Sequence, residues 1–133
     1  MGNRVTVFIT GATGFIGHHV VQNLLRRNCH VIGLIRSSTQ ESKQDRIALL
    51  NKLALGSGKL TWLDGDITAD QLGLDKESQK QALQADHVFH LAALYDLDAP
   101  NDLLKQINTH GTENVCALLE AADYQGVLHH VSS

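Results

Sequence analysis

The sequence predicts an α/β fold in which one parallel β-sheet carries helices on both faces. Short runs rich in β-branched and apolar residues alternate with longer amphipathic stretches along the chain. A glycine-rich turn joins the first apolar run to the first amphipathic stretch. Strand–helix alternation gives parallel pairing through right-handed crossovers, and the doubly wound strand order expected here is 3-2-1-4-5.

The strands are predicted where short apolar runs lie between polar or glycine-containing segments. Their β-branched content and short length favour strands over helices. The five predicted strands are residues 5–9, 30–35, 60–63, 87–91 and 127–131. Because the sequence ends at Ser133, we expect the sheet to be truncated after the fifth strand.

The stretches between the strands carry apolar residues at helical spacing. In the first of them, Ile16, Val20 and Leu24 fall on one helix face. Residues 37–44 are polar and are expected to form a loop. The predicted helices are residues 14–27, 45–55, 77–83 and 101–122, of which the third has the weakest pattern.

Composition narrows the class of protein. The 133 residues are 43% hydrophobic and 19% charged, as in one globular domain. The net charge of −3 and the thin spread of basic residues argue against a nucleic-acid partner. No apolar run reaches the roughly 20 residues of a membrane span, and no signal peptide is evident, so we expect a cytoplasmic protein. Cys29 and Cys116 lack metal-ligand spacing, and we expect neither a disulfide nor a metal site.

Residues 10–17, Thr-Gly-Ala-Thr-Gly-Phe-Ile-Gly, follow the first strand and open the first helix. In that context a glycine-rich turn indicates a dinucleotide-binding Rossmann fold. Gly11 permits a tight turn, Gly14 lets a pyrophosphate approach the backbone, and Gly17 allows close packing of the helix. The first N–H groups and the dipole of the helix then attract the phosphates. The predicted cofactor contacts in this turn are Gly11, Thr13, Gly14, Phe15, Ile16 and Gly17.

The end of the second strand indicates which nicotinamide cofactor binds. NAD-binding Rossmann proteins usually place an acidic residue there, about 20 residues past the glycines, to accept from the ribose 2′-OH. Here Ile35 holds that position and Arg36 follows, with Ser37 and Ser38 next. A guanidinium suits a 2′-phosphate, so NADP is favoured over NAD.

The Gly-x-x-Gly-x-x-Gly spacing of residues 11–17 resembles the extended branch of the short-chain dehydrogenase/reductase superfamily. The resemblance implies that Asp66 accepts from the adenine amine and that Ile67 covers the ring. Residues 90–93, His-Leu-Ala-Ala, resemble the His-x-Ala-Ala segment against which the cofactor's ribose-phosphate lies. The cofactor contacts added in this way are Asp66, Ile67, Leu91, Ala92 and Ala93.

The same resemblance implies two residues of the catalytic apparatus. Asn108 matches the family's Asn-x-x-Gly-Thr on the long helix, where it would support the active-site region from beneath. Ser133, with Ser132 as the alternative, matches the residue that hydrogen-bonds the substrate carbonyl oxygen.

The family's proton donor is a tyrosine four positions before a lysine that lowers its pKa. Ala99 and Leu128 stand four residues after Tyr95 and Tyr124, so neither tyrosine fits. We therefore expect an N-terminal fragment that has no activity by itself. Its fifth strand would lie at an uncovered sheet edge, which favours self-association into homo-oligomers.

Three segments bear on the branch of the superfamily. Residues 65–74, 86–97 and 129–133 look like bacterial fatty-acyl-CoA reductase-like members of the male-sterility type, which reduce thioesters with NADPH. The resemblance thus implies an NADP-dependent reductase of a small-molecule carbonyl or acyl thioester. Two alternatives stay open. One is a nucleotide-sugar epimerase or dehydratase, which usually carries the acidic residue that Ile35 replaces. The other is a non-catalytic NADP-sensing regulator.

Overall fold

A computed structural model of the chain contains one parallel sheet in the order β3-β2-β1-β4-β5. It describes residues 4–12, 14–35, 41–54, 58–91 and 101–130. The strands are β1 (Thr6–Thr10), β2 (His30–Ile35), β3 (Lys59–Asp64), β4 (His87–His90) and β5 (Val127–His130). The predicted fold class and strand order are confirmed, and each strand lies close to its predicted bounds.

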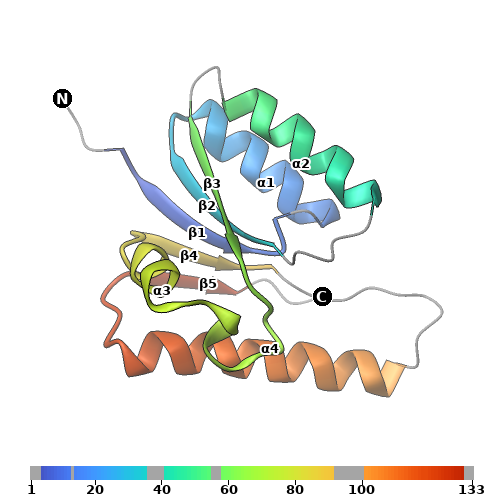
Figure 1. The fold of residues 1–133 in the computed structure, drawn as a ribbon, viewed down its shortest axis with the longest axis vertical. Helices are drawn as coiled ribbons and strands as arrows, with labels where there is room; N and C mark the ends of the chain where they lie inside the picture. The colour runs from blue at the N-terminus through green and yellow to red at the C-terminus, as the bar shows by residue number, and fades with distance from the viewer. Residues whose placement is uncertain (1–3, 13, 36–40, 55–57, 92–100, 131–133) are drawn as a thin grey trace.

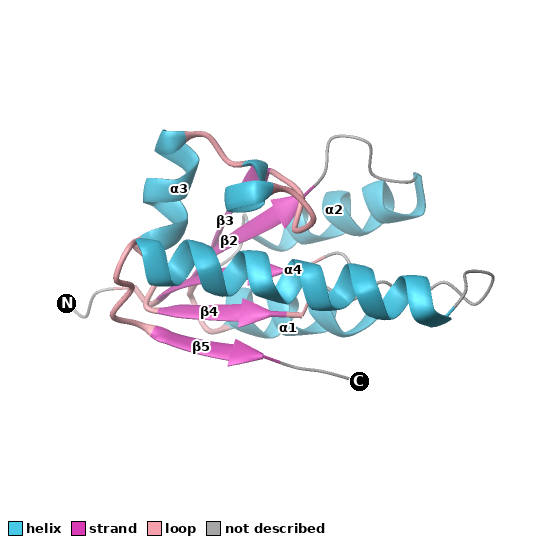
Figure 2. Cartoon of the chain, turned by 90° about the horizontal axis from the view of Figure 1, so that it is seen from below, coloured by secondary structure: helices cyan, strands magenta, loops and turns pink. Residues whose placement is uncertain are grey.

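The helices form two layers, one on each face of the sheet (Figures 1 and 2). One layer consists of α1 (Phe15–Arg26) and α2 (Glu41–Ala54). The other consists of α4 (Asn101–Ala121), α3 (Lys76–Leu83) and the 3₁₀ turn η1 (Asp70–Gly73). Helices on both faces make the sheet doubly wound, as predicted.

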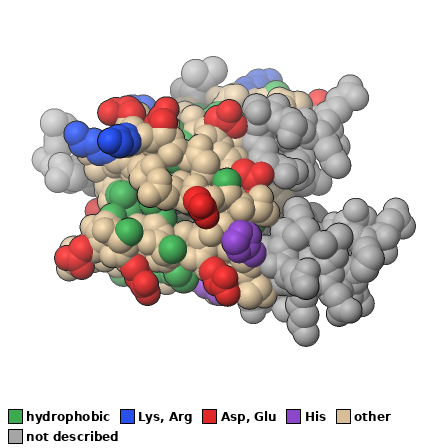
Figure 3. All heavy atoms as spheres, turned by 60° about the horizontal axis from the view of Figure 1, so that its bottom comes forward, with side chains coloured by type: hydrophobic (Ala, Val, Ile, Leu, Met, Phe, Trp, Pro, Cys, Tyr) green, Lys and Arg blue, Asp and Glu red, His purple; other side chains and the backbone are tan. Residues whose placement is uncertain are grey.

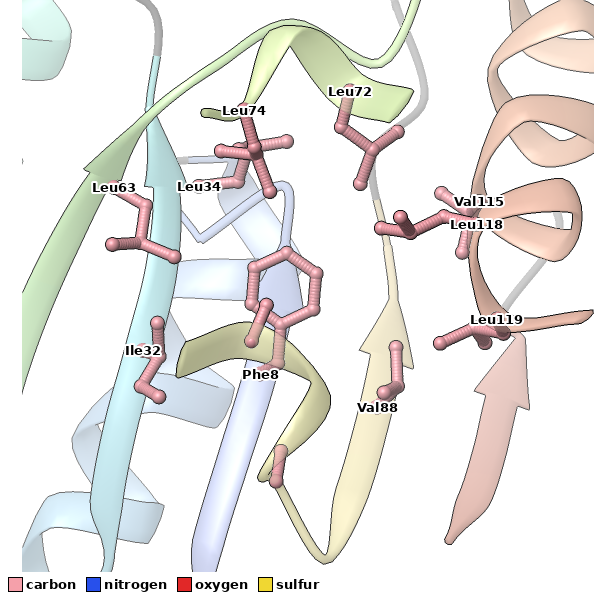
Figure 4. Packing of buried hydrophobic residues seen from close by; sticks show 12 residues of the cluster. Phe8, Ile32, Leu34, Leu63, Leu72, Leu74, Val88, Val115, Leu118 and Leu119 are labelled. Carbon is pink, nitrogen blue, oxygen red and sulfur yellow. The ribbon is translucent and has the colours of Figure 1, made fainter. Parts of the chain in front are cut away.

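Neighbouring residues of β1 belong to different cores. Phe8 faces the α4 layer, where it packs with Leu34 and Val88 (Figure 4). Ile9 faces the other layer and packs with Val21 of α1. Because side chains alternate across a strand and both faces are covered, the middle of β1, residues 7–9, is apolar at every position.

The start of α2 corrects one prediction. Residues 37–44 are expected as a loop from their polarity, but the helix begins at Glu41. Glutamate, lysine and glutamine are good helix formers even without an apolar stripe. Gln44 is exposed, so this first turn of the helix carries no hydrophobic signal that periodicity could detect.

The turn η1 is absent from the sequence-based prediction. Gln71 and Leu72 have φ values of 53° and 58°, the left-handed region that side chains with a Cβ avoid. Leu72 is fully buried and points toward Val115 and Leu118 of α4 (Figure 4). Burial of this leucine offsets the backbone strain, which is a tertiary effect that local sequence preferences do not contain.

The fifth strand is an edge strand whose four residues are all exposed. Val127 retains 50% of its surface and Leu128 36%. Figure 3 turns the α4 layer toward the viewer and shows scattered carboxylates, with basic side chains at the upper left and at the upper edge of the view. In the described part of the chain, no helix is long and apolar enough to cross a membrane.

Candidate dinucleotide-binding site

All five strands are parallel, so their carboxyl ends share one edge of the sheet. β1 and β4 are neighbours in the sheet, but the helices that follow them lie on opposite faces. Such a switch point opens a crevice at the carboxyl ends of the strands, which is where open α/β sheets bind their ligands. The glycine-rich turn follows β1 at this crevice, and Leu91 follows β4.

The turn after β1 has the geometry of a phosphate-binding loop. Gly11 has a φ of 77°, and its carbonyl accepts a hydrogen bond from the Gly14 N–H over 3.1 Å. A Cβ on Gly17 would lie 1.7 Å from the Gly11 oxygen, so the helix approaches the turn in a way that only glycine allows. The backbone thus requires glycine at positions 11 and 17, while the cofactor contacts predicted for these residues stay predictions.

Gly14 is the N-cap of α1 and contributes no side-chain cap to the helix. The first backbone N–H groups of a helix lack intrahelical partners and attract anions together with the helix dipole. Ile16 beside them is 51% exposed. Phe15 begins the helix, and Thr13 lies outside the described residues.

The loop after β3 holds Asp66 in a defined orientation. One oxygen of its carboxylate accepts from the Thr68 N–H over 2.9 Å and from the Thr68 hydroxyl over 2.7 Å. The Asp66 N–H donates to the Leu72 carbonyl over 2.8 Å, so η1 fixes the backbone of this residue. The adenine contact predicted for Asp66 stays a prediction.

Ile67 and helix α4 fit closely against each other. A Cβ on Gly111 would lie 2.6 Å from Cδ1 of Ile67, so the glycine makes room for the isoleucine. The Asn114 side chain donates to the Ile67 carbonyl over 2.7 Å and is itself buried. Asn114 is not among the predicted site residues, because its partner Ile67 is distant in the sequence and no local pattern points to the contact.

His90 occupies the carboxyl end of β4 and is 2% exposed. Its Nδ1 lies 2.7 Å from the hydroxyl of Thr10, and its Nε2 lies 3.0 Å from the hydroxyl of Thr112. Burial, followed by the charge of His130, lowers the pKa of His90 to about 4. The imidazole is therefore neutral near pH 7, and both of its nitrogens have hydrogen-bond partners.

The structure brings only some of the predicted site residues together. Leu91 is half-buried, and its N–H donates to the Thr10 carbonyl over 3.1 Å. Asn108 is half-buried on α4, and its carbonyl accepts from the Thr112 hydroxyl over 3.0 Å. The predicted residues outside the described part of the chain are Thr13, Arg36, Ala92, Ala93, Ser132 and Ser133.

The fold and the glycine-rich turn define a class, the dinucleotide-binding Rossmann domains. Residues 9–133 match the NAD-binding family described as male sterility protein. The chain belongs to this family, which confirms the predicted resemblance to extended short-chain dehydrogenases/reductases and their acyl-CoA reductase-like members.

Several known proteins with related sequences are named as reductases. The chain is 36% identical to the aldehyde reductase lnaA of Aspergillus flavus, over 96% of this chain and 13% of that protein. It is 34% identical to a candidate fatty acyl-CoA reductase of Drosophila melanogaster, over 96% of this chain and 28% of that protein. The chain thus spans less than a third of these relatives.

Solved structures are similar to nearly the whole chain. The terminal R domain from the myxalamid PKS-NRPS biosynthetic pathway superposes with a TM-score of 0.77 and 30% identity, over 100% of this chain and 35% of that one. Gre2 of Candida albicans in complex with NADPH gives a TM-score of 0.70 and 28% identity, over 97% of this chain and 37% of that one. The chain is therefore an NAD(P)-binding Rossmann domain of the short-chain dehydrogenase/reductase type.

Proposed function

We propose that this chain is the cofactor-binding domain of an NADP-dependent reductase whose substrate is a carbonyl compound or an acyl thioester. In this proposal residues 1–133 hold the cofactor, and residues beyond them complete the catalytic site and the substrate pocket. The observation that carries the proposal is the turn after β1. The left-handed Gly11, the side-chain-free N-cap at Gly14 and the close approach of Gly17 together fit a diphosphate.

The diphosphate and the adenosine end of the cofactor each have residues suited to them. The start of α1 offers N–H groups to the diphosphate. On the adenine side, Asp66 is held by Thr68 and by the Leu72 carbonyl, which fixes an acceptor for the exocyclic amine. Arg36 follows β2 directly and supplies a cation for the 2′-phosphate, which agrees with the NADPH in the Gre2 complex.

The reductive chemistry belongs to the cofactor. NADPH, when bound, would supply a hydride, and a proton donor outside residues 1–133 would supply a proton. Together they would convert a carbonyl to an alcohol, or an acyl thioester to an aldehyde and a free thiol. Ser133 donates a hydrogen bond to the substrate carbonyl oxygen and stabilises the negative charge that develops there. Asn108 supports this region from α4. The names of the relatives, aldehyde reductase and candidate fatty acyl-CoA reductase, favour this substrate class.

The cofactor choice is tested by calorimetric titration of the full-length protein with NADPH and with NADH. We expect tighter binding of NADPH, and Arg36→Ala should weaken it by roughly 10- to 150-fold, which corresponds to about 1.5–3 kcal/mol for a charge-assisted contact. Arg27→Ala removes an exposed arginine at the other end of α1 and should leave the preference unchanged. Equal affinities of the wild type for both cofactors would contradict the proposal.

The substrate class is tested by NADPH oxidation with palmitoyl-CoA, decanal and a nucleotide sugar as probes. We expect turnover with one or both of the first two. Turnover of the nucleotide sugar alone would support an epimerase or dehydratase instead. NADPH binding without turnover of any probe would support a sensing role.

A further inference from the structure

One imidazole ring connects four elements at the carboxyl edge of the sheet. His90 of β4 is the register partner of Thr10 on β1 and of His130 on β5. The Thr10 hydroxyl lies 2.7 Å from Nδ1, and the His130 ring stacks on the His90 ring with a centroid distance of 5.1 Å. The Thr112 hydroxyl of α4 lies 3.0 Å from Nε2. The ring is thus held from both neighbouring strands and from the helix that covers them.

The hydrogen bonds around the ring have a defined direction. The Thr112 hydroxyl donates to the Asn108 carbonyl, so its single proton is not available to His90. Nε2 of His90 must therefore carry the proton and donate it to the Thr112 oxygen. Nδ1 is then the acceptor, and the Thr10 hydroxyl donates to it. The chain runs from Thr10 through His90 and Thr112 to the Asn108 carbonyl, and it requires a neutral imidazole in one tautomer.

Three of the segments that meet at His90 lead to described residues of the proposed site. Thr10 precedes the glycine-rich turn, and His90 itself precedes Leu91. Thr112 bonds the carbonyl of Asn108. The residues that these segments contribute are Gly11, Leu91 and Asn108. No other described imidazole is as deeply buried.

We infer that His90 is a positioning residue, which fixes the phosphate-binding turn after β1, Leu91 after β4 and the turn of α4 that carries Asn108 relative to one another. The inference rests on the proposed function, since it assigns His90 a role in that same reaction. His90 does not contact the reacting atoms. It acts through Thr10 and Thr112, and its loss would displace the groups that hold cofactor and substrate.

Substitution of Thr112 tests the role of the hydrogen bond to His90 directly. Valine has the same shape as threonine and carries a methyl group in place of the hydroxyl. In the full-length protein, Thr112→Val should lower kcat by about tenfold or more, since small displacements of positioned groups cost up to a hundredfold. Thr112→Ser retains the hydroxyl and should restore kcat to within about threefold of the wild type. The turnover probes are NADPH with palmitoyl-CoA and with decanal.

The sheet contains a matched control. His30 and Thr61 form another histidine–threonine hydrogen bond of 2.9 Å. His30 is the first residue of β2, and Thr61 lies in the amino-terminal half of β3, away from the carboxyl edge of the sheet. Thr61→Val removes a contact of the same kind. It should lower the stability without lowering kcat.

Hydrogen–deuterium exchange supplies a readout that needs no turnover. Thr112→Val should speed amide exchange by about fivefold in residues 10–17 and in residues 108–112. This factor corresponds to the loss of one hydrogen bond of about 1 kcal/mol. Thr61→Val should leave both segments unchanged. Unaltered exchange in residues 10–17, or equal losses of kcat in Thr112→Val and Thr61→Val, would overturn the inference. A wild type without turnover would contradict the proposed function, and the exchange pattern would then decide the inference alone.

Discussion

The Asn114 amide donates to the Ile67 carbonyl over 2.7 Å, and this contact connects the loop after β3 to helix α4. The two residues are 47 positions apart in the sequence. On one side of the contact lies the loop that carries Asp66, and on the other lies the helix that carries Asn108. The predicted adenine contact and the predicted catalytic asparagine thus depend on a shared packing arrangement.

Replacement of Asn114 should destabilise the fold through this contact. Asn114→Leu keeps the approximate volume but leaves the carbonyl of the half-buried Ile67 without its donor, at a cost of about 1–3 kcal/mol. Glu113 is the exposed neighbour on the same helix, and Glu113→Ala should change the stability by less than about 0.5 kcal/mol. Urea unfolding followed by circular dichroism measures both variants. Equal stabilities would show that the hydrogen bond contributes little.

Two glycines of the phosphate-binding turn should respond differently to one added methyl group. A Cβ on Gly14 would lie 3.3 Å from the Gly11 oxygen, so Gly14→Ala should fold. The methyl group occupies the approach of the diphosphate, so cofactor affinity should fall sharply, and Gly14→Val should abolish binding. The affinity is measured by calorimetric titration, with circular dichroism as the control for folding. Unchanged affinity in both variants would mean that the turn does not hold phosphate.

Gly17→Ala should instead damage the fold. Alanine inside a helix is ordinarily more stable than glycine by about 1 kcal/mol. Here the added Cβ would lie 1.7 Å from the Gly11 oxygen, and overpacking of this kind costs about 1–3 kcal/mol. We therefore expect Gly17→Ala to have a lower melting temperature than the wild type by circular dichroism. A higher melting temperature would mean that the turn moves to accommodate the added methyl group at little cost.

The sequence predicts those features of the structure that depend on local patterns, and it does not predict those that depend on contacts between distant residues. The alternation of apolar runs and the Gly-x-x-Gly-x-x-Gly spacing are local patterns, and they predict the sheet order and the turn after β1. The roles of Leu72 and Asn114 are not local. Leu72 adopts a left-handed conformation only because α4 and the sheet bury it. Asn114 is recognisable as a site residue only when its partner Ile67 is known.

The stability of the protein should depend on pH through His90. Its pKa is about 4 in the folded state, against about 6.5 in an unfolded chain. The folded state therefore favours the neutral ring. The contribution of the neutral His90 ring to the free energy of unfolding is fully present above pH 6.5. As the pH falls from 6.5 to about 4, this contribution is lost, by about 3 kcal/mol in total.

This pH dependence is measured by urea unfolding at several pH values between 7 and 4. His90→Gln keeps a polar side chain but cannot titrate, so its free energy of unfolding should fall less steeply over that interval. Parallel curves for the wild type and His90→Gln would mean that another group causes the acid sensitivity.

A polypeptide of residues 1–133 should have no reductase activity. The proposed reaction needs a hydrogen-bond donor to the substrate oxygen and, as the resemblance implies, a tyrosine as proton donor and a lysine that lowers the pKa of that tyrosine. Tyr124 does not meet the second requirement, because its hydroxyl donates to the Ala85 carbonyl over 2.7 Å, near the amino end of β4. Burial and the nearby Asp86 raise the pKa of Tyr124, whereas a proton donor needs it lowered.

Removal of a general acid typically lowers the rate by about 100- to 10,000-fold, and loss of the substrate pocket lowers it further. NADPH oxidation with palmitoyl-CoA or decanal should therefore stay at the background rate when residues 1–133 are assayed alone. The full-length protein, assayed in parallel, is the positive control. Turnover by residues 1–133 above background would mean that a proton donor lies within them, and Tyr95, which falls outside the described residues, would then be the first to replace by phenylalanine.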